Sequence, residues 1–245
     1  MTLPEAIAVL VAGFAAGGVN TIVGSGSLIT FPTLLAVGFP SVVANVSNSV
    51  GLVPGGISGA IGYRRELRGQ WRRVGILAIG TTAGAIVGGI LLLQLPESVF
   101  DAVVPILILL ACVLMAIKRT PEQHAAAEHT GAGTAASFAT GIYGGYFGAA
   151  QGIILMSLLR FCFPDDLQRL NAIKIVLTAT ANGVAAVLFI FVADVAWDAA
   201  ALIAAGSVVG AAVAARYGRR IPSEVLRWMV VIGGGIVALI LLVTR

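Results

Sequence analysis

The sequence predicts an all-α polytopic membrane protein made of two inverted-topology repeats, and three observations lead to this prediction. Of the 245 residues, 58% are hydrophobic and only 11% are charged, whereas soluble domains carry about 25% charged residues. Apolar runs long enough to cross a hydrocarbon core of ~30 Å recur along the whole chain. The second half also repeats the glycine spacing of the first half, and equivalent loops carry charges of opposite sign.

Eight apolar runs have the length of membrane spans. They lie at roughly 4–23, 41–63, 73–94, 98–117, 134–151, 170–193, 197–215 and 223–243. The opening residues, MTLPEAIAVL, have neither a basic n-region nor a small-residue cleavage site, so we expect a helix there and not a signal peptide. The net charge of +4 comes with arginines in short loops, which is typical of membrane proteins, and we expect no nucleic-acid partner.

The two halves of the chain align with one another. At an offset of 128 residues, GFAAGGVNTIVG (13–24) falls on GIYGGYFGAAQG (141–152), and an offset of 126 then holds to the end. Matched pairs include Gly24/Gly152, Asn45/Asn171 and Trp71/Trp197. The sequence therefore predicts a first membrane repeat over residues 1–118, a connector loop over 119–133 and a second membrane repeat over 134–245.

Charges in the matched loops predict that the repeats are inverted. Arg68 falls opposite Asp194, and Asp101 falls opposite Arg227. Because Lys and Arg prefer the cytoplasmic side, we expect the Arg64–Arg73 loop, the 118–133 connector and the Arg216–Arg220 loop inside and both termini outside. Equivalent loops then lie on opposite faces, which requires an odd number of crossings in each half.

Each half contains a polar, glycine-rich break within an apolar run: NTIVGSGSLITFP (Asn20–Pro32) and GAAQG (Gly148–Gly152). Irregular backbone survives at membrane depth only where protein or a cavity surrounds it, so both breaks must face inward. Three spans follow each break. The broken element must therefore make zero or two crossings, as a re-entrant hairpin or as a glycine-broken pair of short helices. The short second members, Ser27–Gly38 and Ile153–Phe163, favour the hairpin.

Interrupted helices at matching positions of inverted repeats indicate the substrate site of a transporter. The backbone N–H groups at the start of the short helix, from Ser25 to Ile29, favour an anion. A second polar feature is the helix face formed by Asn171, Lys174, Thr178 and Asn182. The candidate substrate-binding residues are Asn20, Thr21, Gly24, Ser25, Gly26, Ser27, Asn45, Asn48, Gln151, Gly152, Asn171 and Lys174.

Simpler interpretations stay open for both features. The glycine-rich breaks are also explained by tight helix packing, as are the Gly-x-x-x-Gly spacings at Gly13/Gly17 and Gly80/Gly84. Lys174 lies roughly two turns into its span, from where a lysine can extend back to the interface. Against this, a lipid-facing stripe of four polar residues would be costly.

The distribution of reactive residues argues against an enzyme and against a metal or cofactor site. All eleven acidic residues fall in loops or near helix ends, so no buried carboxylate relay is predicted. No Cys–His, Ser–His–Asp or His-x-x-x-His pattern lies at membrane depth. Cys112 and Cys162 are expected to fill the core, and His124 and His129 to lie in an exposed loop without further metal ligands.

The stretches 12–67 and 140–189 together resemble the sulfite exporter TauE/SafE family. The shared features are a glycine-rich break after the first helix of each half, an Asn-rich start to the next span, and the Tyr63-Arg64-Arg65 end of that span. Where the family often has three successive glycines, this chain has Gly24-Ser25-Gly26 and Ala149-Ala150-Gln151.

The resemblance implies a secondary transporter in the bacterial plasma membrane. Its expected substrate is a small sulfur oxyanion, such as sulfite or a short organosulfonate, which is exported and is held near the bilayer midplane between the two broken helices. Two alternatives stay open: a carrier of a different small anion or sulfur compound, and a non-transporting accessory membrane subunit. The expected partners are the lipid bilayer and a small-molecule anion.

Overall fold

The computed structural model describes residues 1–116 and 127–217, and these residues confirm the all-α prediction. They contain no β-strand and form nine α-helices: α1 (Leu3–Ile22), α2 (Ser27–Ala36), α3 (Ser41–Gly62), α4 (Trp71–Gln94), α5 (Glu97–Ala116), α6 (Thr130–Tyr146), α7 (Gln151–Cys162), α8 (Leu167–Val192) and α9 (Trp197–Tyr217). The apolar run predicted at 223–243 and most of the Arg216–Arg220 loop lie outside the described residues.

Polar side chains cap helices at both ends of the bundle. Thr2 and Glu5 form a capping box at the start of α1, where the Thr2 N–H donates to Glu5 Oε2 over 2.7 Å. Asp166 caps α8 by accepting from the N–H groups of Gln168 (2.9 Å) and Arg169 (3.1 Å). These bonds satisfy N–H groups that the first turn of a helix leaves without partners.

The start of α6 differs from the prediction. The sequence predicts a loop up to residue 133, but α6 already begins at Thr130. The Thr134 hydroxyl donates to the Thr130 carbonyl over 3.0 Å, so the hydroxyl is satisfied inside the helix. Small polar residues extend a helix without adding to its hydropathy, and hydropathy therefore placed the start too late.

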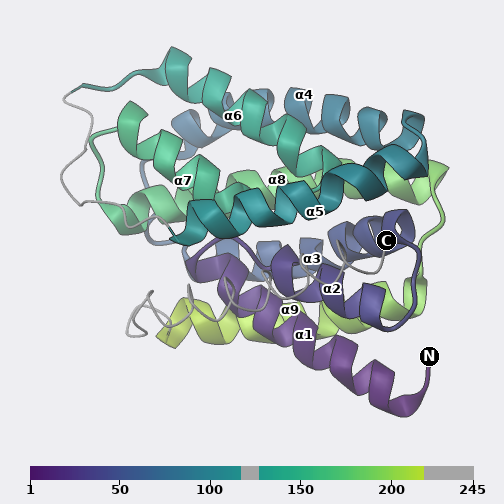
Figure 1. Ribbon diagram of the computed structural model, residues 1–245. Helices are drawn as coiled ribbons and strands as arrows, with labels where there is room; N and C mark the ends of the chain where they lie inside the picture. The colour runs from purple at the N-terminus through teal and green to yellow at the C-terminus, as the bar shows by residue number, and fades with distance from the viewer. Residues whose placement is uncertain (117–126, 218–245) are drawn as a thin grey trace.

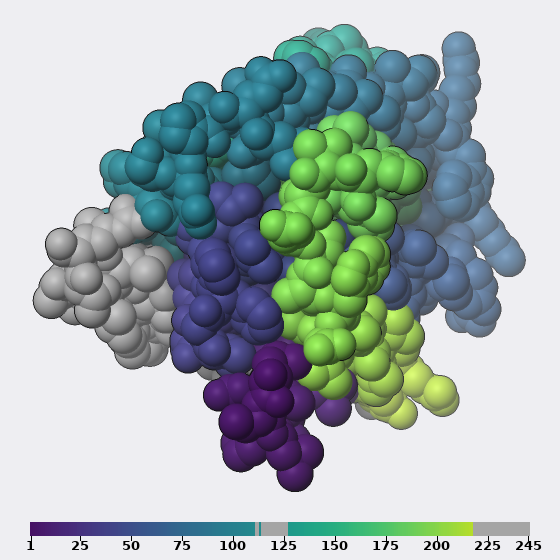
Figure 2. Space-filling view, turned by 90° about the vertical axis from the view of Figure 1, so that its right-hand side faces the viewer, coloured from purple at the N-terminus to yellow at the C-terminus, as the bar shows by residue number. Residues whose placement is uncertain are grey.

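The helices lie side by side in one bundle (Figure 1). Helices α4 and α6 form one edge, α1 and α9 form the opposite edge, and α3 and α8 lie between them and contact each other. Helix α1 packs on α9, and α6 packs on α4. The sequence alignment makes α4 and α9 equivalent, because it pairs Trp71 with Trp197. Figure 2 views the end of the bundle where α1 begins, with α2 and the start of α5 next to each other.

Glycines make the two edges possible, as the Gly-x-x-x-Gly spacings predict. A Cβ at Gly17 would lie 2.2 Å from the Ser207 carbonyl oxygen of α9, and a Cβ at Gly84 would lie 2.1 Å from the Phe138 carbonyl oxygen of α6. Both distances are shorter than any real contact of a methyl group. The absence of side chains there lets neighbouring backbones touch.

Hydrogen bonds and charges fix the α6–α7 pair as a hairpin. The His129 N–H donates to the Cys162 carbonyl over 2.8 Å, which joins the start of α6 to the end of α7. Arg73, in the first turn of α4, forms ion pairs with Glu128 (3.0 Å) and with Asp165. Its hydrogen bond to Glu128 lowers the pKa of that carboxyl. The open ends of the hairpin therefore lie together beside the α3–α4 loop.

Four of the described helices are long and apolar enough to cross a membrane: α1, α4, α8 and α9. Helix α3 has a similar length but contains several Gly, Ser and Asn residues, and ten of its residues are buried. Helices α2 and α7 are shorter apolar helices of 10 and 12 residues. At 1.5 Å per residue, each spans about half of a ~30 Å hydrocarbon core.

Candidate functional site

The two predicted breaks meet inside the bundle. Helix α1 ends at Ile22 and α7 begins at Gln151, and between these helices the Gly152 N–H donates to the Gly24 carbonyl over 3.0 Å. The φ angle of Gly24 is +91°, a left-handed conformation that residues with a Cβ rarely adopt. The backbone of the first half thus contacts the backbone of the second half at the two breaks.

Hydrogen-bond donors without partners surround this contact. Ser25 is 1% exposed and Gln151 is 2% exposed, and neither the Ser25 hydroxyl nor the Gln151 side-chain N–H₂ donates to another described residue. The backbone N–H groups of Ser25, Gly26 and Ser27, at the start of α2, also have no hydrogen bond to another described residue. Buried donors are nearly always paired, so this cluster indicates a place for a polar ligand.

Lys174 adjoins the end of α1. Its side chain is completely buried, and its Nζ donates to the carbonyl oxygens of Asn20 (3.3 Å) and Thr21 (3.4 Å). Asn171, one turn earlier on α8, donates to the same Thr21 carbonyl over 3.2 Å. These carbonyls form the C-terminal, partially negative end of α1. The side chain therefore points into the bundle and does not extend to the membrane interface.

Asn45 and Asn48, on α3, contact other parts of the breaks. The Asn45 side chain donates to the Tyr146 carbonyl, at the end of α6, over 3.0 Å. Asn48 accepts a hydrogen bond from the Thr30 hydroxyl of α2. Both side chains are buried. They contact the end of α6 and the first half of α2, whereas Lys174 contacts the end of α1.

The remaining predicted residues are placed as follows. Ser27 is buried in the first turn of α2, and Gly26 packs against the Ala16 carbonyl of α1. The Gln151 side chain lies against Gly144, one of the α6 glycines. His129 is exposed, Cys162 is a buried free thiol, and His124 and the Cys112 side chain lie outside what the structure describes.

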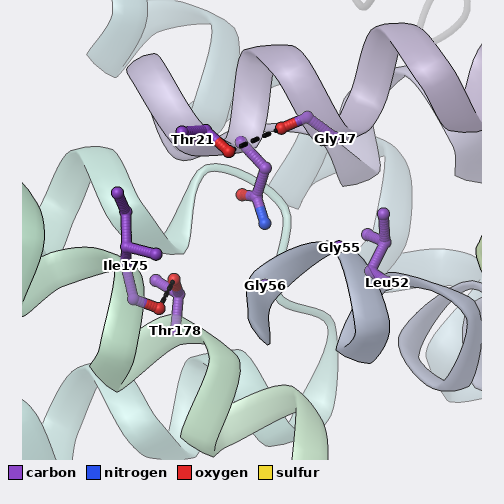
Figure 3. A pocket seen from close by; sticks show the side chains of 8 residues that line it. Gly17, Thr21, Leu52, Gly55, Gly56, Ile175 and Thr178 are labelled. Carbon is purple, nitrogen blue, oxygen red and sulfur yellow. Dashed lines mark hydrogen bonds between the residues drawn. The ribbon is translucent and has the colours of Figure 1, made fainter. Parts of the chain in front are cut away.

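A small pocket adjoins the Lys174 contacts (Figure 3). It has room for about one water molecule. Three helices supply its lining residues: Gly17, Asn20 and Thr21 of α1, Leu52, Gly55 and Gly56 of α3, and Ile175 and Thr178 of α8. In Figure 3, Thr21 and Thr178 donate to backbone carbonyls of their own helices, over 2.8 Å and 3.1 Å.

Sequence reasoning missed most of this lining. Of the eight lining residues, only Asn20 and Thr21 were candidate substrate-binding residues, and Thr178 was noted on the polar face of α8. The Pro54-Gly55-Gly56 sequence inside a predicted span was a usable signal, because consecutive glycines mark a place where backbones or ligands approach closely.

An aromatic cluster lies on the α2 and α5 side of the breaks. Phe31 packs edge-on against Phe147 with ring centres 5.2 Å apart, and Phe100 packs against Phe147 at 6.0 Å and Tyr146 at 5.7 Å. All three phenylalanines are almost fully buried. The cluster fills the space among α2, the start of α5 and the end of α6.

Comparison with known proteins identifies the family. Residues 9–241 match the family described as "Sulfite exporter TauE/SafE". This chain belongs to the TauE/SafE family. The match covers nearly all of the sequence, so family membership applies to the chain as a whole, and it supports a multi-pass membrane transporter of the TauE/SafE type.

Curated relatives agree with this assignment. The chain is 27% identical to a "Probable membrane transporter protein" of Haemophilus influenzae, over 90% of this chain and 88% of the relative. It is 26% identical to "Probable membrane transporter protein ORF9" of Sinorhizobium sp, over 91% and 86%, and to "Probable membrane transporter protein YfcA" of Escherichia coli, over 89% and 82%. No solved structure matches the chain significantly. The relatives' names agree with the prediction that the chain is not an enzyme.

The close contact between the breaks predicts an effect on stability. A Cβ at Gly152 would lie 2.6 Å from the Gly24 Cα, so Gly152→Ala forces the two backbones apart. We expect a loss of about 1–3 kcal/mol of unfolding free energy, as for other overpacked cores, measured by denaturation in detergent. Gly183→Ala is the control, because a Cβ at Gly183 meets no atom within 4 Å. Equal stability of the two variants would show that the breaks are not in close contact.

Proposed function

We propose that this chain is a secondary transporter that exports a small sulfur oxyanion, such as sulfite or a short organosulfonate. The observation that carries the proposal is the meeting of two chain breaks beside a buried lysine and a group of buried donors that have no partner among the described residues. Such a group suits a compact anion with several oxygen atoms. The family description supports sulfite as the first substrate to test.

The anion is held where the breaks meet. The N–H groups at the start of α2 carry partial positive charge, and the Ser25 hydroxyl and Gln151 amide add neutral donors. Lys174 supplies the full positive charge, because no other cationic side chain of the described residues lies among these donors. Asn171 keeps the end of α1 in place through Thr21.

The proposal includes two inverted repeats, over 1–118 and 134–245, that move around this site. The contacts support an internal symmetry. Helix α1 packs on α9 as α6 packs on α4, and α1 packs on the short α2 as α6 packs on the short α7. The short members, α2 and α7, act as re-entrant elements that enter the membrane from opposite faces. The sign swap between Arg68 and Asp194 supports opposite faces for equivalent loops.

Cysteine labelling tests the inverted topology. Arg68 and Asp194 occupy equivalent positions in the two halves, and both are exposed. In intact cells, a membrane-impermeant thiol reagent should modify Asp194→Cys and leave Arg68→Cys unmodified until the membrane is opened. The native residues Cys112 and Cys162 are first replaced by serine. Labelling of both variants from the same side would contradict the inverted arrangement.

Transport by the purified chain in proteoliposomes tests the function itself. Uptake of sulfite, sulfate, sulfoacetate and thiosulfate is compared, with and without an imposed proton or sodium gradient. Lys174→Gln should weaken anion affinity roughly ten- to a hundred-fold, because a charge-assisted contact contributes about 1.5–3 kcal/mol. The control is Arg72→Gln, which removes an exposed charge and should leave affinity unchanged.

The outcomes separate the candidate functions. Flux of another anion in place of sulfur oxyanions would identify a carrier of different specificity. No flux of any anion under any gradient would favour a non-transporting accessory subunit. Unchanged sulfite affinity in Lys174→Gln would show that helix ends and neutral donors alone hold the anion.

A further inference from the structure

Lys174 is buried without an acidic partner among the described residues. Its side chain is 0% exposed, and its Nζ donates to two backbone carbonyls of α1. Salt bridges join Arg73 to Glu128 and Asp165, and Arg169 to Asp165, at one end of the bundle, and Lys174 takes part in none of them. Isolated buried charges are costly. A charged Lys174 would therefore be unfavourable while no anion is bound, because no negative side chain in the described part of the chain compensates it.

The helices around α8 supply no carboxylate near Lys174. Helix α8 packs against α1, α3, α4, α6 and α7. No residue of α3 is titratable, and those of the other elements, α8 included, lie mostly near helix ends: Glu5 of α1, Arg72 and Arg73 of α4, Tyr143 and Tyr146 of α6, Arg160 and Cys162 of α7, and Arg169 of α8. Among the described residues, the one opposing charge available to Lys174 is the partial charge at the end of α1, about half of an electron.

The geometry of the contacts fits a neutral amine. The two Nζ contacts measure 3.3 and 3.4 Å, and both acceptors are uncharged carbonyl oxygens. An ammonium has three donors and no acceptor, and the structure provides two acceptors. A neutral amine has two donors, which match the two carbonyls, and a lone pair that is free to accept a proton.

We infer that Lys174 takes up a proton when the anion binds and releases both together, so that the protein moves one proton with each monoanion. This inference rests on the proposed function and extends it to the coupling ion. In the empty site the amine is neutral. A proton from the solution, delivered as hydronium or by the buffer acid, then binds the nitrogen lone pair and forms the third N–H bond of an ammonium, from which the anion accepts hydrogen bonds. The loaded site carries no net charge, which lowers the cost of moving it through the low-dielectric core.

The pocket lies beside the carbonyls that Lys174 contacts. Its lining includes Asn20 and Thr21, the residues whose carbonyls contact Nζ. The pocket has room for about one water molecule, and in the proposed cycle a water there relays the proton between the solution and the amine. After the anion leaves, the proton returns through the same water to the solution, and Lys174 is again a neutral amine.

Isothermal titration calorimetry with ethanesulfonate tests the coupling in detergent-solubilised protein. Ethanesulfonate is the anion of a strong acid and stays a monoanion, so any proton taken up belongs to the protein. Titrations in buffers of different ionisation enthalpy give the number of protons bound. At mildly alkaline pH we expect about one proton per anion, and an affinity that falls about tenfold per pH unit.

Two substitutions and a control make the test specific. Lys174→Arg keeps the positive charge but cannot lose its proton, so it should bind with no proton uptake and no pH dependence. Lys174→Gln should bind roughly ten- to a hundred-fold more weakly, also without proton uptake. Arg72→Gln, in an exposed position, should behave like the unmodified protein.

The results distinguish failure of the coupling from failure of the function. If ethanesulfonate binds with the same enthalpy in every buffer, no proton is taken up. That result would overturn the coupling and leave the proposed anion site intact. Proton uptake that persists in Lys174→Arg and Lys174→Gln would assign it to another group and would also overturn the inference. No binding of either ethanesulfonate or sulfite would contradict the proposed function, and the coupling with it.

Discussion

The hydrogen bond from the Gly152 N–H to the Gly24 carbonyl joins the two halves of the chain at their breaks. Neither residue has a Cβ, and the approach of the two backbones depends on that absence. The contact fixes where α2 and α7 begin, because each short helix starts within three residues of it. It also prevents either break from closing into a continuous helix, so the N–H groups at the start of α2 stay available.

The rest of the site is arranged around this contact. Asn171 and Lys174 hold the end of α1 through its last carbonyls, and Asn45 holds the end of α6. Aromatic rings fill the interior on the α2 and α5 side, whereas glycines and small side chains leave a pocket among α1, α3 and α8. The two sides of the breaks therefore differ, although the halves are similar in sequence. A transporter needs such a difference, because its site must open to one side at a time.

Local patterns predicted most of the fold. The spans expected at 41–63 and 73–94 correspond to Ser41–Gly62 and Trp71–Gln94, because hydropathy and turn residues act over short distances. The alignment of the halves predicted that Gly24 and Gly152 occupy equivalent places, and the structure brings them together. The predicted start of α6 was wrong, because Thr130 and its neighbours are helical without being apolar. Tertiary packing determined what sequence patterns did not: Phe31, Phe100 and Phe147 share no periodicity, and nothing local indicates which carbonyls Lys174 contacts.

An anion bound at the breaks is the central claim, and a heavy-atom analogue tests it most directly. Selenite has the shape and charge of sulfite, and selenium scatters X-rays anomalously. An anomalous difference map from crystals of the protein grown with selenite locates the selenium atom and distinguishes the anion from bound water. The proposed site predicts one strong peak within hydrogen-bonding distance of Ser25 Oγ and near Lys174 Nζ. Peaks confined to the arginine-rich loops, with none where Gly24 meets Gly152, would contradict it.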